Sequence, residues 1–144
     1  MGLDMYLKRE VYIGNNYKDK KEQFSIDVPG VDQKSVVSVI VEAGYWRKAN
    51  AIHKWFVDNV QDGVDNCGRY YVSNENLQDL LDVVKKVLKD HKLATSLLPT
   101  KSGFFFGDQS IENDYYFEML KDTKNILEAA VKEEKGDFYY VSSW

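Results

Sequence analysis

Apolar residues recur with two different periods along this chain. Near the start, Leu3, Met5 and Leu7 alternate with other residues, which is the pattern of a strand with one buried face. Further along, apolar residues recur every three to four positions, as they do on one face of a helix. Strands come first, and helices interleaved with short strands follow. This order predicts an α+β fold, in which a mainly antiparallel sheet packs against about three helices in a single layer.

The predicted strands combine β-branched or aromatic residues with turn residues at their ends. The clearest is the continuous run SVVSVIVEA at 35–43, bounded by Pro29-Gly30 and Gly44. The full set of predicted strands is 2–13, 24–28, 35–43, 69–73, 104–106 and 137–144.

The predicted helices cover about 46–60, 74–88 and 111–133. Ser73 has the right residue type and position for an N-cap, and Gly136 ends the last helix. The second helix is the best patterned, and its single apolar stripe consists of Leu77, Leu80, Leu81, Val84, Val87 and Leu88.

Length and charge restrict the class of protein. At 144 residues the chain is most simply one globular domain, 1–144. Its net charge of −4 argues against broad nucleic-acid binding, which needs a basic surface. The single Cys67 excludes an internal disulfide and fits a reducing cytosol. We expect no signal peptide and no membrane span.

Known catalytic and ligand motifs are missing from the sequence. It contains no glycine-rich nucleotide fingerprint, no nucleophile elbow and no metal-ligand spacing. The acidic loop holding Asp62 and Asp65 has the wrong spacing for calcium. We therefore assign no catalytic residue, no metal and no cofactor, and we favour a protein that is not an enzyme.

One flank of the first predicted helix, 46–60, is the candidate site. At about 100° per residue, Trp46, Asn50 and His53 lie between the apolar and solvent faces, with Arg47 at their edge. Trp46 could stack on a planar ligand, Asn50 could bind a base edge, His53 could exchange a proton, and Arg47 could reach a phosphate. The alternative is a boundary helix in which a backbone carbonyl satisfies His53.

Phe105 is the second candidate. A strand over 104–106 would place Phe105 on the face opposite Phe104 and Phe106. Phe105 is then either buried under a helix or exposed as part of a partner surface.

Several sequence words suggest an origin. They include MGLDMYL at the start, YWRKANAIHKWF in the middle and DFYYVSSW at the end. Together they resemble a family of small uncharacterised proteins encoded by tailed bacteriophages and prophages. The resemblance spans the chain except for about 8–34. It supplies no catalytic residues, but it implies a phage accessory protein that acts in the cytoplasm of a host bacterium.

We therefore expect a binding protein that inhibits or modulates a host system, such as an anti-CRISPR-like inhibitor of a defence effector. One alternative is a sponge for a nucleotide signal that uses Trp46, Arg47, Asn50 and His53. Another is a small hydrolase or nuclease centred on His53. The remaining alternative is a structural or assembly protein whose surface aromatic residues form an oligomer interface, such as that of a homodimer.

Overall fold

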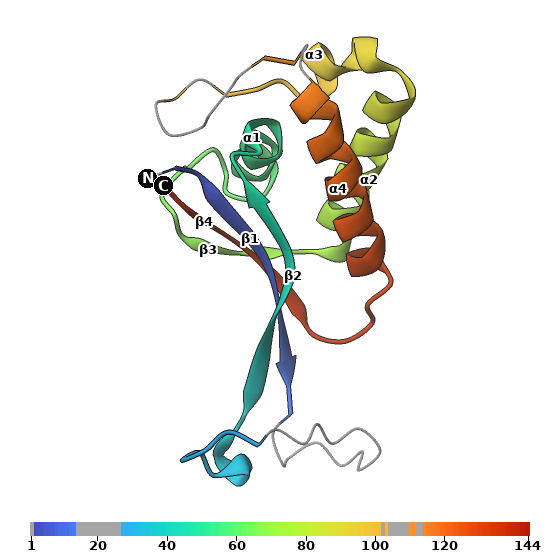
Figure 1. The fold of residues 1–144 in the computed structure, drawn as a ribbon. Coiled ribbons are helices and arrows are strands. Elements are labelled where there is room, and N and C mark those ends of the chain that lie inside the picture. The colour runs from blue at the N-terminus through green and yellow to red at the C-terminus, as the bar shows by residue number, and fades with distance from the viewer. Residues whose placement is uncertain (1, 14–26, 102, 104–109, 112–113) are drawn as a thin grey trace.

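The computed structural model describes residues 2–13, 27–101, 103, 110–111 and 114–144. These residues form one antiparallel sheet with strand order β2-β1-β4-β3 and an accompanying set of helices (Figure 1), which confirms the α+β class. The strands are β1 (Asp4–Tyr12), β2 (Ser38–Arg47), β3 (Arg69–Val72) and β4 (Asp137–Ser143). The α-helices are α1 (Asn50–Asn59), α2 (Asn74–Lys89), α3 (Ala94–Leu97) and α4 (Asp114–Val131).

One face of the sheet carries the core. The predicted alternation in β1 is confirmed, because Leu3, Met5 and Leu7 are all fully buried. Phe138 and Tyr140 of β4 point to the same side and are buried as well. The buried residues of α1, α2 and α4 belong to the same hydrophobic cluster as these strand residues, so the three helices share one core with that face of the sheet.

The structure confirms the second predicted helix, including its N-cap at Ser73 and its buried apolar face. The hydroxyl of Ser73 accepts a hydrogen bond from the Asn76 backbone N–H at 3.0 Å, and the Asn76 side chain accepts one from the Ser73 backbone at 3.2 Å. This reciprocal capping box satisfies two backbone donors at the start of α2. The apolar stripe then packs α2 against α4.

The first helix begins later than predicted, and the strand before it ends later. The predicted start at Trp46 is wrong because β2 continues through Arg47. The strand stops at Lys48, whose φ of 54° lies in the left-handed region, and α1 starts at Asn50. The indole of Trp46 is buried under α4 and donates a hydrogen bond to the Thr123 hydroxyl at 2.9 Å.

Two predicted strands fall on residues that are not described. Of 24–28, only Asp27 and Val28 are described, and they are not in a strand. The segment 104–106, and with it Phe105, lies outside the described residues. The short helix α3 was not predicted.

The hairpin of β1 and β2 extends beyond the rest of the sheet. β4 pairs with β1 only as far as Glu10, whereas β2 accompanies β1 to Tyr12. We call the two-stranded end of this hairpin, residues 11–13 and 37–39, the arm. Figure 1 shows it projecting away from the helices. A hairpin without further strands is only marginally stable in water, so the arm depends on the rest of the sheet for its stability.

Gly44 supplies a test of how β2 docks on α4. A Cβ at this position would lie 2.5 Å from Cγ2 of Ile126. We predict that Gly44→Ala lowers the free energy of unfolding by about 1–3 kcal/mol through overpacking. In an Ile126→Ala background the same change should cost less than about 1 kcal/mol. Denaturant unfolding of the four proteins measures this coupling, and equal costs in both backgrounds would contradict the described contact.

Candidate functional site

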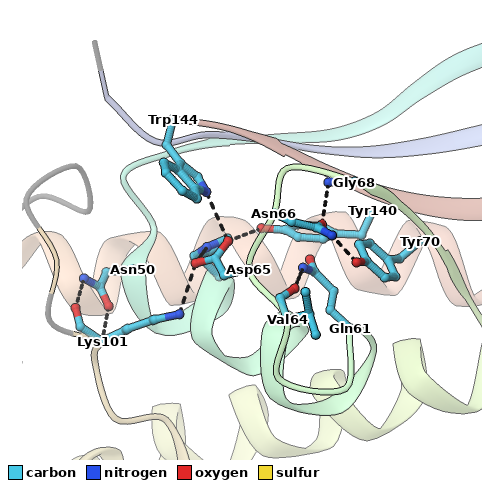
Figure 2. Close-up of polar contacts among 11 residues, drawn as sticks. Asn50, Gln61, Val64, Asp65, Asn66, Gly68, Tyr70, Lys101, Tyr140 and Trp144 are labelled. Carbon is cyan, nitrogen blue, oxygen red and sulfur yellow. Dashed lines mark hydrogen bonds and ion pairs between the residues drawn. The ribbon is translucent and has the colours of Figure 1, made fainter.

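The carboxylate of Asp65 joins three other segments of the chain. Asp65 lies in the loop between α1 and β3, where its Oδ2 is 2.9 Å from His53 Nε2 of α1. Lys101 Nζ contacts the same oxygen at 3.0 Å, and the indole of Trp144 donates to Oδ1 at 3.0 Å. Figure 2 shows Trp144 and Lys101 approaching Asp65 from different sides. The C-terminal residue, the first helix and the segment after α3 are thereby tied to one side chain.

His53 has a second partner in the core. Its Nδ1 lies 2.7 Å from the hydroxyl of Tyr140, and both side chains are fully buried. The Tyr140 ring stacks on Phe56, with ring centroids 4.0 Å apart and planes 8° from parallel. This stacking fixes the hydroxyl against the imidazole. We call His53, Asp65, Lys101, Tyr140 and Trp144 the polar cluster.

Asn50 anchors the polar cluster to the chain after α3. Its amide nitrogen donates to the Lys101 carbonyl at 2.6 Å, and its oxygen accepts from the Lys101 backbone N–H. A buried side chain therefore pairs with both backbone groups of one residue, as a neighbouring strand would. This pairing holds Lys101 where its ammonium group can reach Asp65.

The electrostatics define the protonation state of the cluster. Burial lowers the pKa of His53, and the neighbouring Asp65 carboxylate only partly opposes this effect. Burial tends to raise the pKa of Asp65, but hydrogen bonds from His53, Lys101 and Trp144 outweigh it and hold that pKa below its usual value. Burial, reinforced by Asp65, raises the pKa of Tyr140 well above the ordinary value.

At neutral pH these shifts select one arrangement of protons. Tyr140 keeps its proton and donates to Nδ1 of His53, and the neutral imidazole donates from Nε2 to Asp65. Each ring nitrogen of His53 then has a partner of the opposite hydrogen-bonding type. The predicted backbone-carbonyl partner for His53 is replaced by two side chains.

The geometry favours a structural role over catalysis. A general base must reach the proton of its substrate, and neither His53 nor Tyr140 has any exposed surface. Only the outer part of the cluster meets solvent, where the side chains of Asp65 and Lys101 are 11% and 32% exposed. In the part of the chain that the structure describes, no three His, Cys, Asp or Glu side chains gather as metal ligands.

The structure places the four predicted site residues in two separate locations. Asn50 and His53 belong to the interior around Asp65. Trp46 and Arg47 instead line a hollow of about 200 Å³ between β2 and α4. The nucleotide-binding arrangement requires all four side chains around one ligand, and the structure brings them together only in pairs.

Sequence reasoning missed most of the polar cluster. Lys101, Tyr140 and Trp144 were not singled out for this role, and Asp65 was considered only as a poor calcium ligand. Their contacts with each other and with His53 join positions between 12 and 87 residues apart. One local signal was present, because a His buried on a helix requires partners and an acidic loop follows that helix.

The side of the sheet opposite the helices presents tyrosines. One comes from each strand: Tyr6, Tyr45, Tyr71 and Tyr139, and we call this surface the open face. The Tyr6 and Tyr45 rings lie 5.3 Å apart, and those of Tyr71 and Tyr139 lie 5.9 Å apart. Tyr45 and Tyr71 at the two edges are 44% and 58% exposed. Such a concentration of exposed aromatic rings is typical of a partner surface.

No family model matches the chain, and no match was found among curated proteins or among solved structures. Across the described ranges, no helix combines the length and the apolar character needed to cross a bilayer. The function must therefore be argued from the polar cluster and the open face.

The depressed pKa of His53 predicts acid sensitivity. The unfolded state binds a proton at His53 more readily than the folded state, so stability is complete above about pH 6.5 and falls as the pH drops below that value. We predict that the free energy of unfolding declines between pH 7.5 and 5. The His53→Gln protein should be less stable and lose this part of the decline, whereas the exposed His91→Gln control should keep it. Urea titrations across this range measure the effect, and an unchanged decline in His53→Gln would contradict it.

Removal of the Asp65 charge tests whether this carboxylate holds the polar cluster together. Asp65→Asn keeps the shape but weakens three hydrogen bonds, so we expect a loss of about 2–3 kcal/mol in the free energy of unfolding. Trp144 should also lose its fixed environment, which near-UV circular dichroism detects. The exposed loop change Asp62→Asn is the matched control. Equal stability of the two variants would show that Asp65 does not hold these segments.

Proposed function

We propose that this is a non-catalytic phage accessory protein that binds a host protein through its open face, in the cytoplasm of the infected bacterium. The bound protein belongs to a host system that the phage must inhibit, such as a CRISPR–Cas effector. The observation that carries the proposal is the presence of four tyrosines, one from each strand, on the uncovered side of the sheet.

Tyrosine is well suited to such a surface. It offers a large rigid contact area at a low entropic cost, and tyrosine and arginine are enriched among residues that dominate binding energy. Arg69 is the arginine on the open face. Its guanidinium carbon lies 3.7 Å from the centroid of the Tyr139 ring. The ring pairs hold these side chains in place before a partner arrives, which reduces the cost of ordering them.

The charges on the open face favour a protein partner over a nucleic acid. Arg69 pairs with Glu10 at 2.7 Å, and Arg47 lies 3.6 Å from Asp4. These two arginines are thus compensated by neighbouring carboxylates, and the whole chain carries a net charge of −4. A phosphate backbone requires uncompensated cations.

The arm extends this surface with apolar side chains. Tyr12 and Val37 are more than half exposed on the arm, and so is Ile40 where the arm joins the sheet. Exposed apolar side chains on a projecting ribbon fit a protein partner or a second copy of the chain. A solution mass measurement separates the homodimer from a monomer that awaits its host target.

The proposal makes a specific prediction for tyrosine variants. Tagged protein should retain a bacterial protein from a lysate, and Tyr71→Ser combined with Tyr45→Ser should reduce its retention about tenfold or more. Both side chains are exposed, so the fold should survive, which far-UV circular dichroism checks. Val64→Ser, at an equally exposed position outside the open face, should bind as the wild type does.

Two results would contradict the proposal. One is the absence of any stable protein partner in lysates of the relevant bacteria. The other is a partner retained equally by the double tyrosine variant and by Val64→Ser. The counter-defence part is tested separately, because expression of the protein in cells with an active CRISPR–Cas system should restore phage plating, and the double variant should not.

A further inference from the structure

A hollow of about 200 Å³ opens at the edge of the sheet, between the end of β2 and the first half of α4. Tyr45 and Trp46 contribute from the strand, and Tyr115 contributes from the helix. This volume is below the roughly 300–1,000 Å³ that sites for drug-sized ligands occupy. The hollow is therefore suited to a single small group or one side chain.

Two carboxylates share this hollow. Glu118 and Asp122 are one turn apart on α4 and both line it. Neither forms an ion pair with a described residue. Like charges at this spacing repel each other along a helix. A cation placed between them would remove that repulsion.

The positive charge nearest to the hollow is already compensated. Arg47 also lines it, but its guanidinium group lies 3.6 Å from the Asp4 carboxylate and beside Gly2. The Tyr45 hydroxyl donates to the same Asp4 carboxylate, and the Tyr115 hydroxyl donates to the Arg47 carbonyl. The polar ends of both tyrosines are thus occupied by internal hydrogen bonds, which hold their rings in the walls of the hollow.

We propose that this hollow binds an organic cation, namely the guanidinium or ammonium group of an arginine-like or lysine-like molecule. Aromatic rings attract such cations electrostatically, and carboxylates form charge-assisted hydrogen bonds with them. The same pair of carboxylates repels a phosphate, so the hollow selects against nucleotides. The source of the cation is either a free amine or a basic side chain of a partner protein that reaches past Tyr45 from the open face.

The inference is tested with the full chain by nuclear magnetic resonance. The ¹⁵N-labelled protein is titrated with agmatine, with a blocked Gly-Arg-Gly peptide and with a blocked Gly-Glu-Gly peptide at constant ionic strength. The indole N–H of Trp46 is a nearby reporter, because Trp46 lines the hollow and its indole is fixed by the hydrogen bond to Thr123. We expect saturable shifts of this signal with agmatine and the arginine peptide, at millimolar dissociation constants, and none with the glutamate peptide.

A double variant removes the charge but keeps the shape. Glu118→Gln with Asp122→Asn should weaken binding of the arginine peptide about fivefold or more. Asp79→Asn, an exposed change on α2, is the matched control and should bind as the wild type does. Equal affinity for agmatine and the peptide would assign the site to a free amine, and tighter peptide binding would assign it to a protein side chain.

Three outcomes overturn the inference: no saturable shift with either cation up to about 50 mM, unchanged affinity in the double variant, or an equal response to potassium chloride. The failure of this test leaves the proposed function in place, because Tyr71 on the open face does not line the hollow and can bind a partner without it. If the tyrosine variants instead still retained their partner, the proposed function would fail, while the cation titration of the wild-type protein would be unaffected.

Discussion

A neutral imidazole buried between a hydroxyl and a carboxylate organises this protein. His53 contacts Tyr140 at 2.7 Å and Asp65 at 2.9 Å, with no exposed surface of its own. A buried polar group is costly without partners, so the imidazole stabilises the fold only when both contacts form. That requirement fixes α1 over β4 and draws the loop after α1, the Lys101 segment and the terminal Trp144 to the same place. The group that first resembles a catalytic residue is therefore a structural centre.

The described helices share their core with one side of the sheet, and the opposite side carries exposed tyrosines. Packing explains Phe138 and Tyr140, which face the helices, but it does not explain Tyr71 and Tyr139 on the other side. The arm adds more exposed apolar side chains, and the hollow beside α4 adds an acidic, aromatic recess at the edge. The open face and the hollow meet at Tyr45, whereas the arm lies toward the other end of β2. Such a surface suits a protein that binds a partner. The buried polar cluster, by contrast, has a structural role.

Local patterns predicted much of the fold. The alternation of Leu3, Met5 and Leu7 and the capping role of Ser73 depend on neighbouring residues, so they could be recognised in the sequence. The boundary at Trp46 could not, because an aromatic residue fits the apolar face of a strand or a helix equally well. Its position was decided by the left-handed backbone at Lys48 and by burial under α4. The partners of His53 depend on contacts across the fold, which periodicity does not encode.

The protonation state of His53 is the most direct test of this account. Nuclear magnetic resonance of the ring nitrogens resolves which nitrogen carries a proton and at what pH the second one is gained. The account predicts a neutral ring at pH 7 with the proton on Nε2 and an acceptor at Nδ1, unchanged until the pH falls below the ordinary histidine range. A doubly protonated ring at pH 7, or a proton on Nδ1 of the neutral ring, would contradict it. Either result would mean that the Tyr140–His53–Asp65 chain does not hold the fold in the way described.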